Sequence, residues 1–536
     1  MAVKPLSAPE LGATVCALVD YAEDRGLIDA QDRVWARNAV LEAIGATGPA
    51  PGHPSQAAPG AGPFDLEAAL EALAEAAVAN GAAADTATGR DRAAMRVMGA
   101  LTPRPSQVAR TFEELRRGPG PKAATDYLYR LSCDAGYVRR GAIARNIRWT
   151  GTTRWGELEI TINLSKPEKD PREIAAAADA GAAGTSGTAA PYPACQLCLQ
   201  NEGYPGRPAG PTGAAHPARQ NLRIAPIELG DERWGLQFSP YAYYDEHCIA
   251  MSAEHRPMHI DRAAFACLFD FVDQFPHYFI GSNADLPIVG GSILSHDHFQ
   301  GGAHEFPLMH APAAQAFRLQ GFPQVEAAVL EWPLTVVRLS STSRGELLDA
   351  CVHTTDAWRA RSDEAVGIIA RTPDGAPHNT VTPVLRRRGA RYEAYLALRC
   401  NITSAEHPLG VFHPHAELHH IKKENIGLIE AMGLAILPPR LAGELDAVKR
   451  CLLGAAAEPS SAALSKSLLA DPRSAPHAPW ALEVFERRGA QMTQRNIDVI
   501  LQDEVAQVFA RVLEDAGVFK WDGAGRQALA RFLATL

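Results

Sequence analysis

Two histidines separated by one residue are the strongest sign of chemistry in this chain. His296 and His298 stand in the run Ser-His-Asp-His-Phe-Gln, with Gln300 two residues further on. If this stretch is a β-strand, alternate residues share a face, so both imidazoles and the carboxamide point the same way. Paired glycines flank the run at 290–291 and 301–302. Glycine lets a backbone approach a ligand closely and adopt positive φ, so the run suits attack on a phosphoryl group.

The His-x-His spacing alone leaves a second interpretation open. Two close imidazoles also complete metal sites or polar networks without acting as nucleophiles. The glycines and Gln300 raise nucleophilic chemistry to an equal footing with that alternative. Asn283 and Ser292 are candidate ligand contacts from the same stretch, although turn capping explains both residues equally well.

A Cys-x-x-Cys pair, Cys195 and Cys198, lies in a segment flanked by proline and glycine. This spacing lets two thiolates reach one tetrahedral metal ion. By itself the pair is equally compatible with redox chemistry or with two unrelated reduced thiols. Histidines are dense further along the chain: His247, His255, His259, His277, His296 and His298.

The run from Asp285 to Gly302 resembles the signature of the second class of galactose-1-phosphate uridylyltransferases, also called UDP-glucose–hexose-1-phosphate uridylyltransferases. Further blocks, which with this run extend the resemblance over nearly the whole chain, are residues 98–134, 192–207, 238–260 and 399–441. The resemblance implies transfer of UMP between UDP-glucose and galactose 1-phosphate in galactose metabolism, through a uridylyl-histidine intermediate. It also implies UDP-galactose and other hexose 1-phosphates as ligands, and a homodimer.

The resemblance also implies roles for particular residues. His298 is the expected nucleophile, and Gln300 matches a glutamine that donates to a phosphoryl oxygen of the intermediate. A neutral imidazole is a good nucleophile near neutral pH and, once protonated, a good leaving group. The expected substrate contacts are Asn283, Gly290, Gly291, Ser292, Lys166, Lys169, Arg172, Lys422 and Lys423. For the cluster Lys166, Lys169 and Arg172, a solvated charged face is the alternative explanation.

A zinc site follows from the same resemblance. The first class of these transferases binds zinc with a Cys-x-x-Cys, a distant histidine and the first histidine of the His-x-His. By order and spacing, this pattern falls on Cys195, Cys198, His255 and His296, with His247 as a rival to His255. Thiolate and imidazole ligands suit Zn²⁺ in a structural role. No organic cofactor is expected.

A second His-x-His, His413-Pro-His415, superficially resembles the catalytic motif of the first class. It lacks flanking paired glycines, and Glu417 replaces the glutamine two residues on, so it is not the expected nucleophile. Two other functions stay open at this stage. One is a nucleotide-sugar hydrolase or phosphorylase of the same superfamily, and the other is a non-catalytic, zinc-stabilised nucleotide-binding protein.

Composition limits the remaining choices. The 536 residues carry a net charge of −9, which argues against a nucleic acid as the main partner. No run approaches the roughly 20 apolar residues of a membrane span, and the N-terminus lacks the order of a signal peptide. Nine cysteines are sparse and odd in number, which favours reduced thiols in a cytoplasm.

Hydrophobic periodicity predicts an α+β fold with mainly antiparallel sheets and helical N- and C-terminal regions. Helices are expected within 1–44, from Asp65 to Gly81, and over 105–117, 262–275, 421–434 and 443–536. Strands are expected at 157–164, 234–238, 246–252, 334–339 and 392–398, with loops at 45–63 and 174–190. The resemblance implies a histidine-triad-like fold. Four regions are predicted: a helical region 1–130, a catalytic half 131–310, a second half 311–440 and a helical region 441–536.

Overall fold

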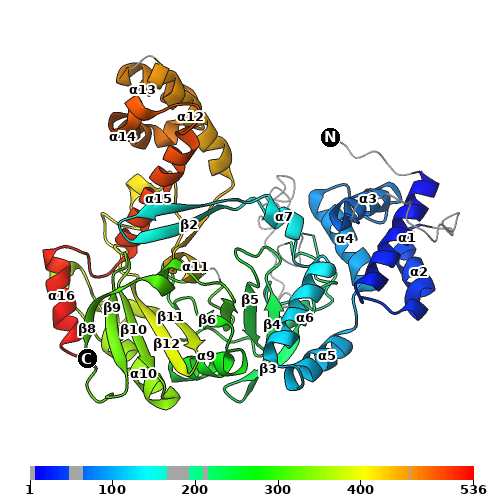
Figure 1. The fold of residues 1–536 in the computed structure, drawn as a ribbon, viewed down its shortest axis with the longest axis horizontal. Coiled ribbons are helices and arrows are strands. Elements are labelled where there is room, and N and C mark those ends of the chain that lie inside the picture. The colour runs from blue at the N-terminus through cyan, green and yellow to red at the C-terminus, as the bar shows by residue number, and fades with distance from the viewer. Residues whose placement is uncertain (1–6, 47–63, 166–191, 209–214, 292, 458–459) are drawn as a thin grey trace. The chain divides into compact units, whose positions relative to one another are not determined.

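The computed structural model describes residues 7–46, 64–165, 192–208, 215–291, 293–457 and 460–536 (Figure 1). It contains two compact units, each assembled from several stretches of chain. The first comprises Met1–Ala144, Ser165–Ala242 and Glu246–Arg256, and the second Arg145–Leu164, Tyr243–Asp245 and Pro257–Leu536. The predicted loop at 174–190 and most of the loop at 45–63 lie outside the described residues. The four predicted regions stay predictions.

The first unit consists of helices followed by a small antiparallel sheet. The helices are α1 (Ala8–Asp24), α2 (Arg33–Ala43), α3 (Leu66–Ala79), α4 (Ala87–Leu101), α5 (Pro105–Arg117), α6 (Pro121–Asp134) and α7 (Arg140–Ala144). The strands are β3 (Ala225–Leu229), β4 (Glu232–Phe238) and β5 (Cys248–Ser252), paired in that order. Asp65 caps α3 as predicted, since its side chain accepts a hydrogen bond from the Ala68 N–H at 3.0 Å.

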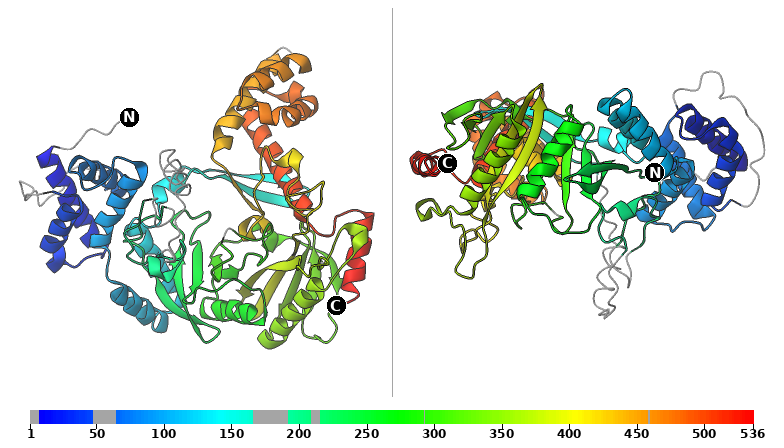
Figure 2. Two further views of the ribbon diagram at one scale, coloured as in Figure 1. Left: turned by 180° about the vertical axis from the view of Figure 1, so that it is seen from behind. Right: turned by 90° about the horizontal axis from the view of Figure 1, so that it is seen from below.

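The larger sheet of the second unit carries the predicted nucleophile. Its strands lie in the order β7-β6-β11-β12-β10-β9-β8, and every neighbouring pair is antiparallel. The bounds are β6 (Phe279–Gly281), β7 (His298–Gly302), β8 (Ala313–Phe317), β9 (Glu326–Leu330), β10 (Val336–Ser341), β11 (Asn379–Arg388) and β12 (Arg391–Cys400). Helices α9 (Arg262–Gln274) and α10 (Arg344–Arg359) contact each other and these strands, and cover one face of the sheet (Figure 2).

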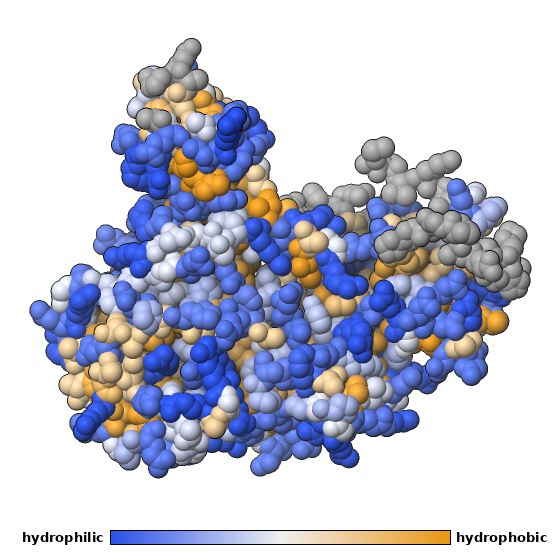
Figure 3. All heavy atoms as spheres, in the orientation of Figure 1, coloured by the Kyte–Doolittle hydropathy of each residue, from blue (hydrophilic) through white to orange (hydrophobic). Residues whose placement is uncertain are grey.

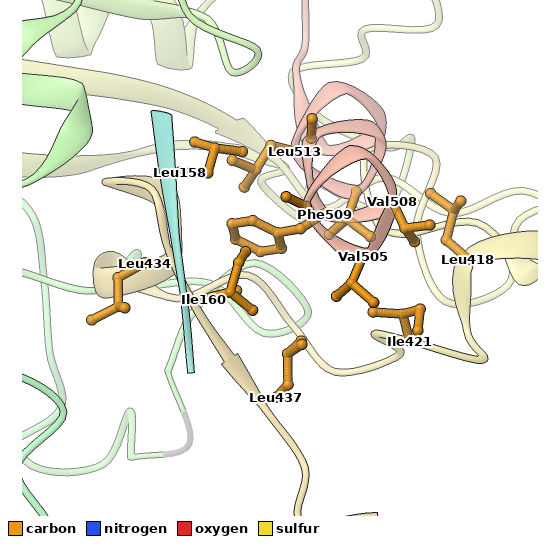
Figure 4. Close-up of a cluster of buried hydrophobic side chains, with 14 of the residues drawn as sticks. Leu158, Ile160, Leu418, Ile421, Leu434, Leu437, Val505, Val508, Phe509 and Leu513 are labelled. Atoms are coloured by element: carbon orange, nitrogen blue, oxygen red, sulfur yellow. The ribbon is translucent and has the colours of Figure 1, made fainter. Parts of the chain in front are cut away.

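A second sheet in this unit has three strands, β1 (Ile147–Thr153), β2 (Gly156–Ile162) and β13 (Leu434–Leu437). β1 and β2 form an antiparallel hairpin, and β13 runs parallel to β2. Leu158 and Ile160 alternate with polar residues along β2, as predicted, and pack against Val505 and Phe509 of α15 (Ile497–Ala516), as Figure 4 shows. The remaining helices are α11 (Leu428–Ala431), α12 (Arg440–Ala457), α13 (Ser461–Ala470), α14 (Ala478–Arg488) and α16 (Gly523–Leu533).

The predicted helix over 421–434 is wrong, because only the four residues of α11 are helical there. Gly427 directly precedes α11, and Gly433 follows it with φ 103°, a conformation that ends a helix. The predicted C-terminal helices are confirmed, beginning with α12 at Arg440. The apolar periodicity of 421–434 reflects burial in an irregular segment, where Ile421, Ile426 and Leu428 are all nearly inaccessible.

The α+β fold with mainly antiparallel sheets is therefore confirmed. The face of the molecule seen in Figure 3 is mostly hydrophilic, with hydrophobic residues in small separate patches. Within the described ranges, no helix combines the length and the apolar character needed to cross a membrane.

Truncating Phe509 tests the contact between α15 and the three-stranded sheet. Phe509 is fully buried, so Phe509→Ala should lower the free energy of unfolding by roughly 3–5 kcal/mol. Val499→Ala is the matched control, because Val499 lies on the same helix but is 57% exposed. Urea denaturation followed by circular dichroism measures both changes. Equal effects of the two substitutions would contradict this account of the packing.

Candidate active site

The predicted catalytic strand is shorter than the motif that it carries. β7 begins at His298 and pairs with β6, with Gln300 opposite Gly281 and Gly302 opposite Phe279. His298 and Gln300 therefore share one face of a strand, as predicted. His296 precedes the strand, so the expected alternation does not extend to it. The chain bends at Ser295 and His296 instead of running straight into the strand.

This bend brings the backbone of His296 onto the ring of His298. Nδ1 of His298 lies 2.8 Å from the carbonyl oxygen of His296. A carbonyl oxygen only accepts hydrogen bonds, so Nδ1 carries the proton and Nε2 carries the lone pair of the neutral ring. Burial lowers the pKa of His298, whose residue is only 4% exposed, and so favours this neutral form. The result is an imidazole with one nucleophilic nitrogen.

The glycines before the strand act through close packing. Neither Gly290 nor Gly291 has positive φ, so the expectation of positive φ is wrong for this pair. Gly302, at the end of β7, does have positive φ, at 151°. A Cβ on Gly290 would lie 2.4 Å from the carbonyl oxygen of Ala284. A Cβ on Gly291 would lie 2.6 Å from Nδ2 of Asn283. Both positions therefore need glycine because the loop folds tightly on itself.

Two polar side chains anchor this loop to distant parts of the second unit. The Oδ1 atom of Asn283 accepts a hydrogen bond at 2.9 Å from the N–H of Leu428, the first residue of α11. Asp285 accepts from the Ile260 N–H at 2.9 Å, pairs with Arg359 at 3.0 Å, and accepts from the Thr380 hydroxyl. Asp285 was not singled out from the sequence, because its partners lie up to about a hundred residues away.

Two cysteines and one histidine form a candidate metal centre in the first unit. The donor atoms of Cys195, Cys198 and His255 all lie within 4.8 Å of one another. The two sulfur atoms are 3.2 Å apart, and no disulfide bond joins them. Two thiols and an imidazole are a donor set that zinc prefers, so the residues fit such an ion. His247, the rival to His255, is not part of this group. His296 belongs to the second unit, so the first unit supplies three of the four predicted ligands.

The structure describes only two of the predicted basic contacts, Lys422 and Lys423. Lys166, Lys169, Arg172 and the loop residue Ser292 lie outside the described residues. Lys422 is 4% exposed, and its ammonium forms an ion pair with Glu430 and donates to the carbonyl of Ile436 at 3.3 Å. Lys422 therefore already neutralises a buried carboxylate inside the fold. Lys423 is exposed.

The second His-x-His is held inside the fold. The two ring nitrogens of His413 each lie 3.2 Å from an oxygen, the Pro414 carbonyl on one side and Oδ1 of Asn425 on the other. Nε2 of His415 lies 3.1 Å from the carbonyl oxygen of Val411. Since both nitrogens of His413 already have partners, His298 is better prepared for attack on a phosphorus atom.

Comparisons with known proteins place the chain in one family. The family described as "Galactose-1-phosphate uridyl transferase, N-terminal domain" matches residues 42–257, and the corresponding C-terminal domain matches residues 271–460. Galactose-1-phosphate uridylyltransferase of Bacillus subtilis is 48% identical, covering 97% of this chain and 96% of its own. The transferase of the same name from Halalkalibacterium halodurans is 46% identical over 99% of this chain and all of its own length.

The chain therefore belongs to the galactose-1-phosphate uridylyltransferase family and is an enzyme of the transferase class. Among solved structures, yeast Ap4A phosphorylase Apa2 matches with a TM-score of 0.31 and 11% identity, over 68% of this chain and 92% of its own. A TM-score this low does not establish a shared fold, so the histidine-triad-like relationship stays a prediction.

Gly291→Ala tests the packing of the glycine loop. The added methyl group would displace the Asn283 side chain from the Leu428 N–H, so we expect a loss of roughly 1–3 kcal/mol in unfolding free energy. Introducing the same substitution into Asn283→Ala should cost much less, because the clash is gone. Gly345→Ala is the control, since nothing lies within 4 Å of its added Cβ. Additive effects at 283 and 291 would contradict the proposed contact.

Proposed function

We propose that this enzyme transfers UMP from UDP-glucose to galactose 1-phosphate, giving UDP-galactose and glucose 1-phosphate, in galactose metabolism. Family membership and the names of the relatives support the overall reaction. The observation that supports the chemistry is the hydrogen bond from Nδ1 of His298 to the His296 carbonyl, which leaves Nε2 as the nucleophile. The proposal includes a homodimer and a cytoplasmic location.

In the first half-reaction, the Nε2 lone pair of His298 attacks the α-phosphorus of UDP-glucose. A P–N bond forms, and the bond from the α-phosphorus to the bridging oxygen breaks, so that glucose 1-phosphate leaves with the electron pair. The uridylylated ring now carries a positive charge, with its proton held on Nδ1 against the His296 carbonyl. That charge makes the imidazole a good leaving group when galactose 1-phosphate attacks in the second half-reaction.

The oxygens of the transferred phosphoryl group need donors that do not compete as nucleophiles. Gln300 shares the strand face of His298, and its carboxamide N–H is the proposed donor. Backbone N–H groups of the loop from Asn283 to Ser292 are the next proposed contacts, with Gly290 and Gly291 keeping that loop tight. Lys166, Lys169, Arg172 and Lys423 are proposed for the remaining phosphate charge. Lys422 is better assigned to Glu430.

The proposal also includes a structural zinc ion. Cys195, Cys198 and His255 supply three ligands, and His296 is the proposed fourth. When bound, zinc supplies no redox chemistry but fixes the positions of its ligands. Coordination through the His296 ring would hold the residue whose carbonyl receives the Nδ1 proton of His298. Metal binding and nucleophile orientation would then depend on the same residue.

Covalent labelling tests the nucleophile. Mixing the enzyme with UDP-glucose labelled in the uridine, without acceptor, should leave acid-labile, base-stable label on the protein. His298→Gln should carry none, whereas His310→Gln, which changes an exposed histidine, should be labelled like wild type. Galactose 1-phosphate should release the label as UDP-galactose. Label retained in His298→Gln would refute the assignment, and release only as UMP would favour a hydrolase.

Elemental analysis tests the metal. Purified wild type should contain about one zinc per chain, and Cys198→Ser should lose it. Cys16→Ser is the matched control, because Cys16 is a free cysteine that does not belong to the ligand group. A chelator should lower the thermal midpoint of wild type and of Cys16→Ser, but not of Cys198→Ser. Wild type without metal, and insensitive to the chelator, would exclude the zinc site.

A further inference from the structure

The loop between β6 and β7 holds one residue in an unfavourable backbone conformation. Ile288 has φ 72°, in the left-handed region that β-branched residues rarely adopt. Such a conformation persists only where surrounding contacts hold it in place. Ile288 lies two residues before Gly290, whose backbone is among the proposed phosphate contacts. A change of conformation at Ile288 would therefore move the N–H groups that the reaction needs.

A hydrogen bond from a distant asparagine holds the residue just before Ile288. Nδ2 of Asn401 donates to the carbonyl oxygen of Pro287 at 3.2 Å. Asn401 follows directly after β12 and is 8% exposed, whereas Pro287 lies at the surface. The Pro287 carbonyl belongs to the same planar peptide unit as the Ile288 N–H. Fixing this carbonyl therefore restrains the φ angle of Ile288.

The side chain of Asn401 is itself oriented by His378. The two residues extend the β11–β12 pair by one step, since the Asn401 N–H donates to the His378 carbonyl at 2.9 Å. Nδ1 of His378 lies 2.7 Å from Oδ1 of Asn401. An amide oxygen only accepts hydrogen bonds, so Nδ1 donates to it, and the Asn401 Nδ2 group is left facing the Pro287 carbonyl. Nε2 of His378 lies 3.2 Å from the Thr372 hydroxyl, which restrains the ring on its other side.

The segment that follows Asn401 also packs directly on Ile288. A Cβ on Gly410 would lie 3.0 Å from Cγ2 of Ile288, so the two residues are already in close contact. Gly410 comes nine residues after Asn401, and both belong to the second unit together with the loop. One stretch of chain therefore supplies both the hydrogen bond before Ile288 and the packing against its side chain.

We propose that Asn401, oriented by His378, is a positioning residue for uridylyl transfer. It holds the peptide unit of Ile288, and thereby keeps the backbone N–H groups of Gly290 and Gly291 in place for the transferred phosphoryl group. The proposal rests on the transfer function above and extends it to residues outside the loop. Donors that are fixed before the reaction stabilise transition-state charge without having to reorganise first. Neither Asn401 nor His378 is assigned a contact with the substrate.

Asn401→Ala tests this role by steady-state kinetics with UDP-glucose and galactose 1-phosphate. It should lower kcat about tenfold or more and change KM for UDP-glucose less, because the phosphoryl donors are no longer held in place. The thermal midpoint should stay close to that of wild type, since Pro287 lies at the surface, where water can replace the lost donor. Asn80→Ala is the matched control. Nδ2 of Asn80 also donates to a backbone carbonyl, that of Ile44 at 2.9 Å, and its loss should leave kcat unchanged.

A second background separates positioning from a general loss of stability. Asparagine adopts positive φ more readily than isoleucine does, so Ile288→Asn reduces the need for the bond to Pro287. In that background, Asn401→Ala should lower kcat only about twofold, because the two sites are coupled. An equal loss of kcat in both backgrounds overturns the proposal. Wild-type kcat in folded Asn401→Ala enzyme also overturns it.

Substitutions at His378 cover the case in which Asn401→Ala fails to fold. His378→Leu removes the donor to Oδ1 and frees the Asn401 amide to rotate, so it should also lower kcat. His378→Asn keeps an N–H donor in place of Nδ1 and should retain most of the wild-type kcat. Wild-type kcat in His378→Leu, or an equal loss in both variants, overturns the proposal. Absence of transfer by the wild type would instead refute the proposed function itself.

Discussion

The hydrogen bond between Nδ1 of His298 and the backbone carbonyl of His296 is the interaction on which the rest of the site depends. A neutral imidazole has one protonated nitrogen and one lone pair, and an acceptor at Nδ1 decides which is which. The chain leaves strand geometry before His298, and the His296 carbonyl then lies 2.8 Å from the ring of the residue two positions on. A straight strand through both histidines would have directed that carbonyl to a neighbouring strand.

The position of this bend is set by the loop that precedes it. Asp285 ties the loop to Ile260, Arg359 and Thr380, and Asn283 ties it to the residue that begins α11. Ile288 has φ 72° in this loop, a conformation that β-branched residues rarely adopt and that needs surrounding contacts to persist. The strain is localised between anchored residues, which is where a fold can maintain it.

Patterns with short-range causes could be predicted from the sequence. The Asp65 cap, the helix Pro105–Arg117 and the alternation along β2 each follow from residues a few positions apart. The hydrogen-bond acceptor for the His298 ring could not be predicted. Every residue has a backbone carbonyl, so the residue types do not indicate which one accepts the bond. The ion pair of Lys422 with Glu430 could not be predicted from the sequence for a different reason. A lysine near a predicted phosphate site suggests a ligand contact, and only the fold shows that a carboxylate eight residues on is buried beside it.

In the proposed ping-pong transfer, one nucleophile serves two different sugars while the uridylyl group stays the same. The larger sheet carries His298 and Gln300, the residues proposed to hold the uridylyl group, which is identical in both half-reactions. In the smaller sheet, Glu159 pairs with His304, which follows β7 in the chain. Tyr244 joins the two through Gly301 without contributing a group to the chemistry. Neither contact uses a group of the proposed chemistry, so the tautomer of His298 depends on the loop before β7 and not on the smaller sheet.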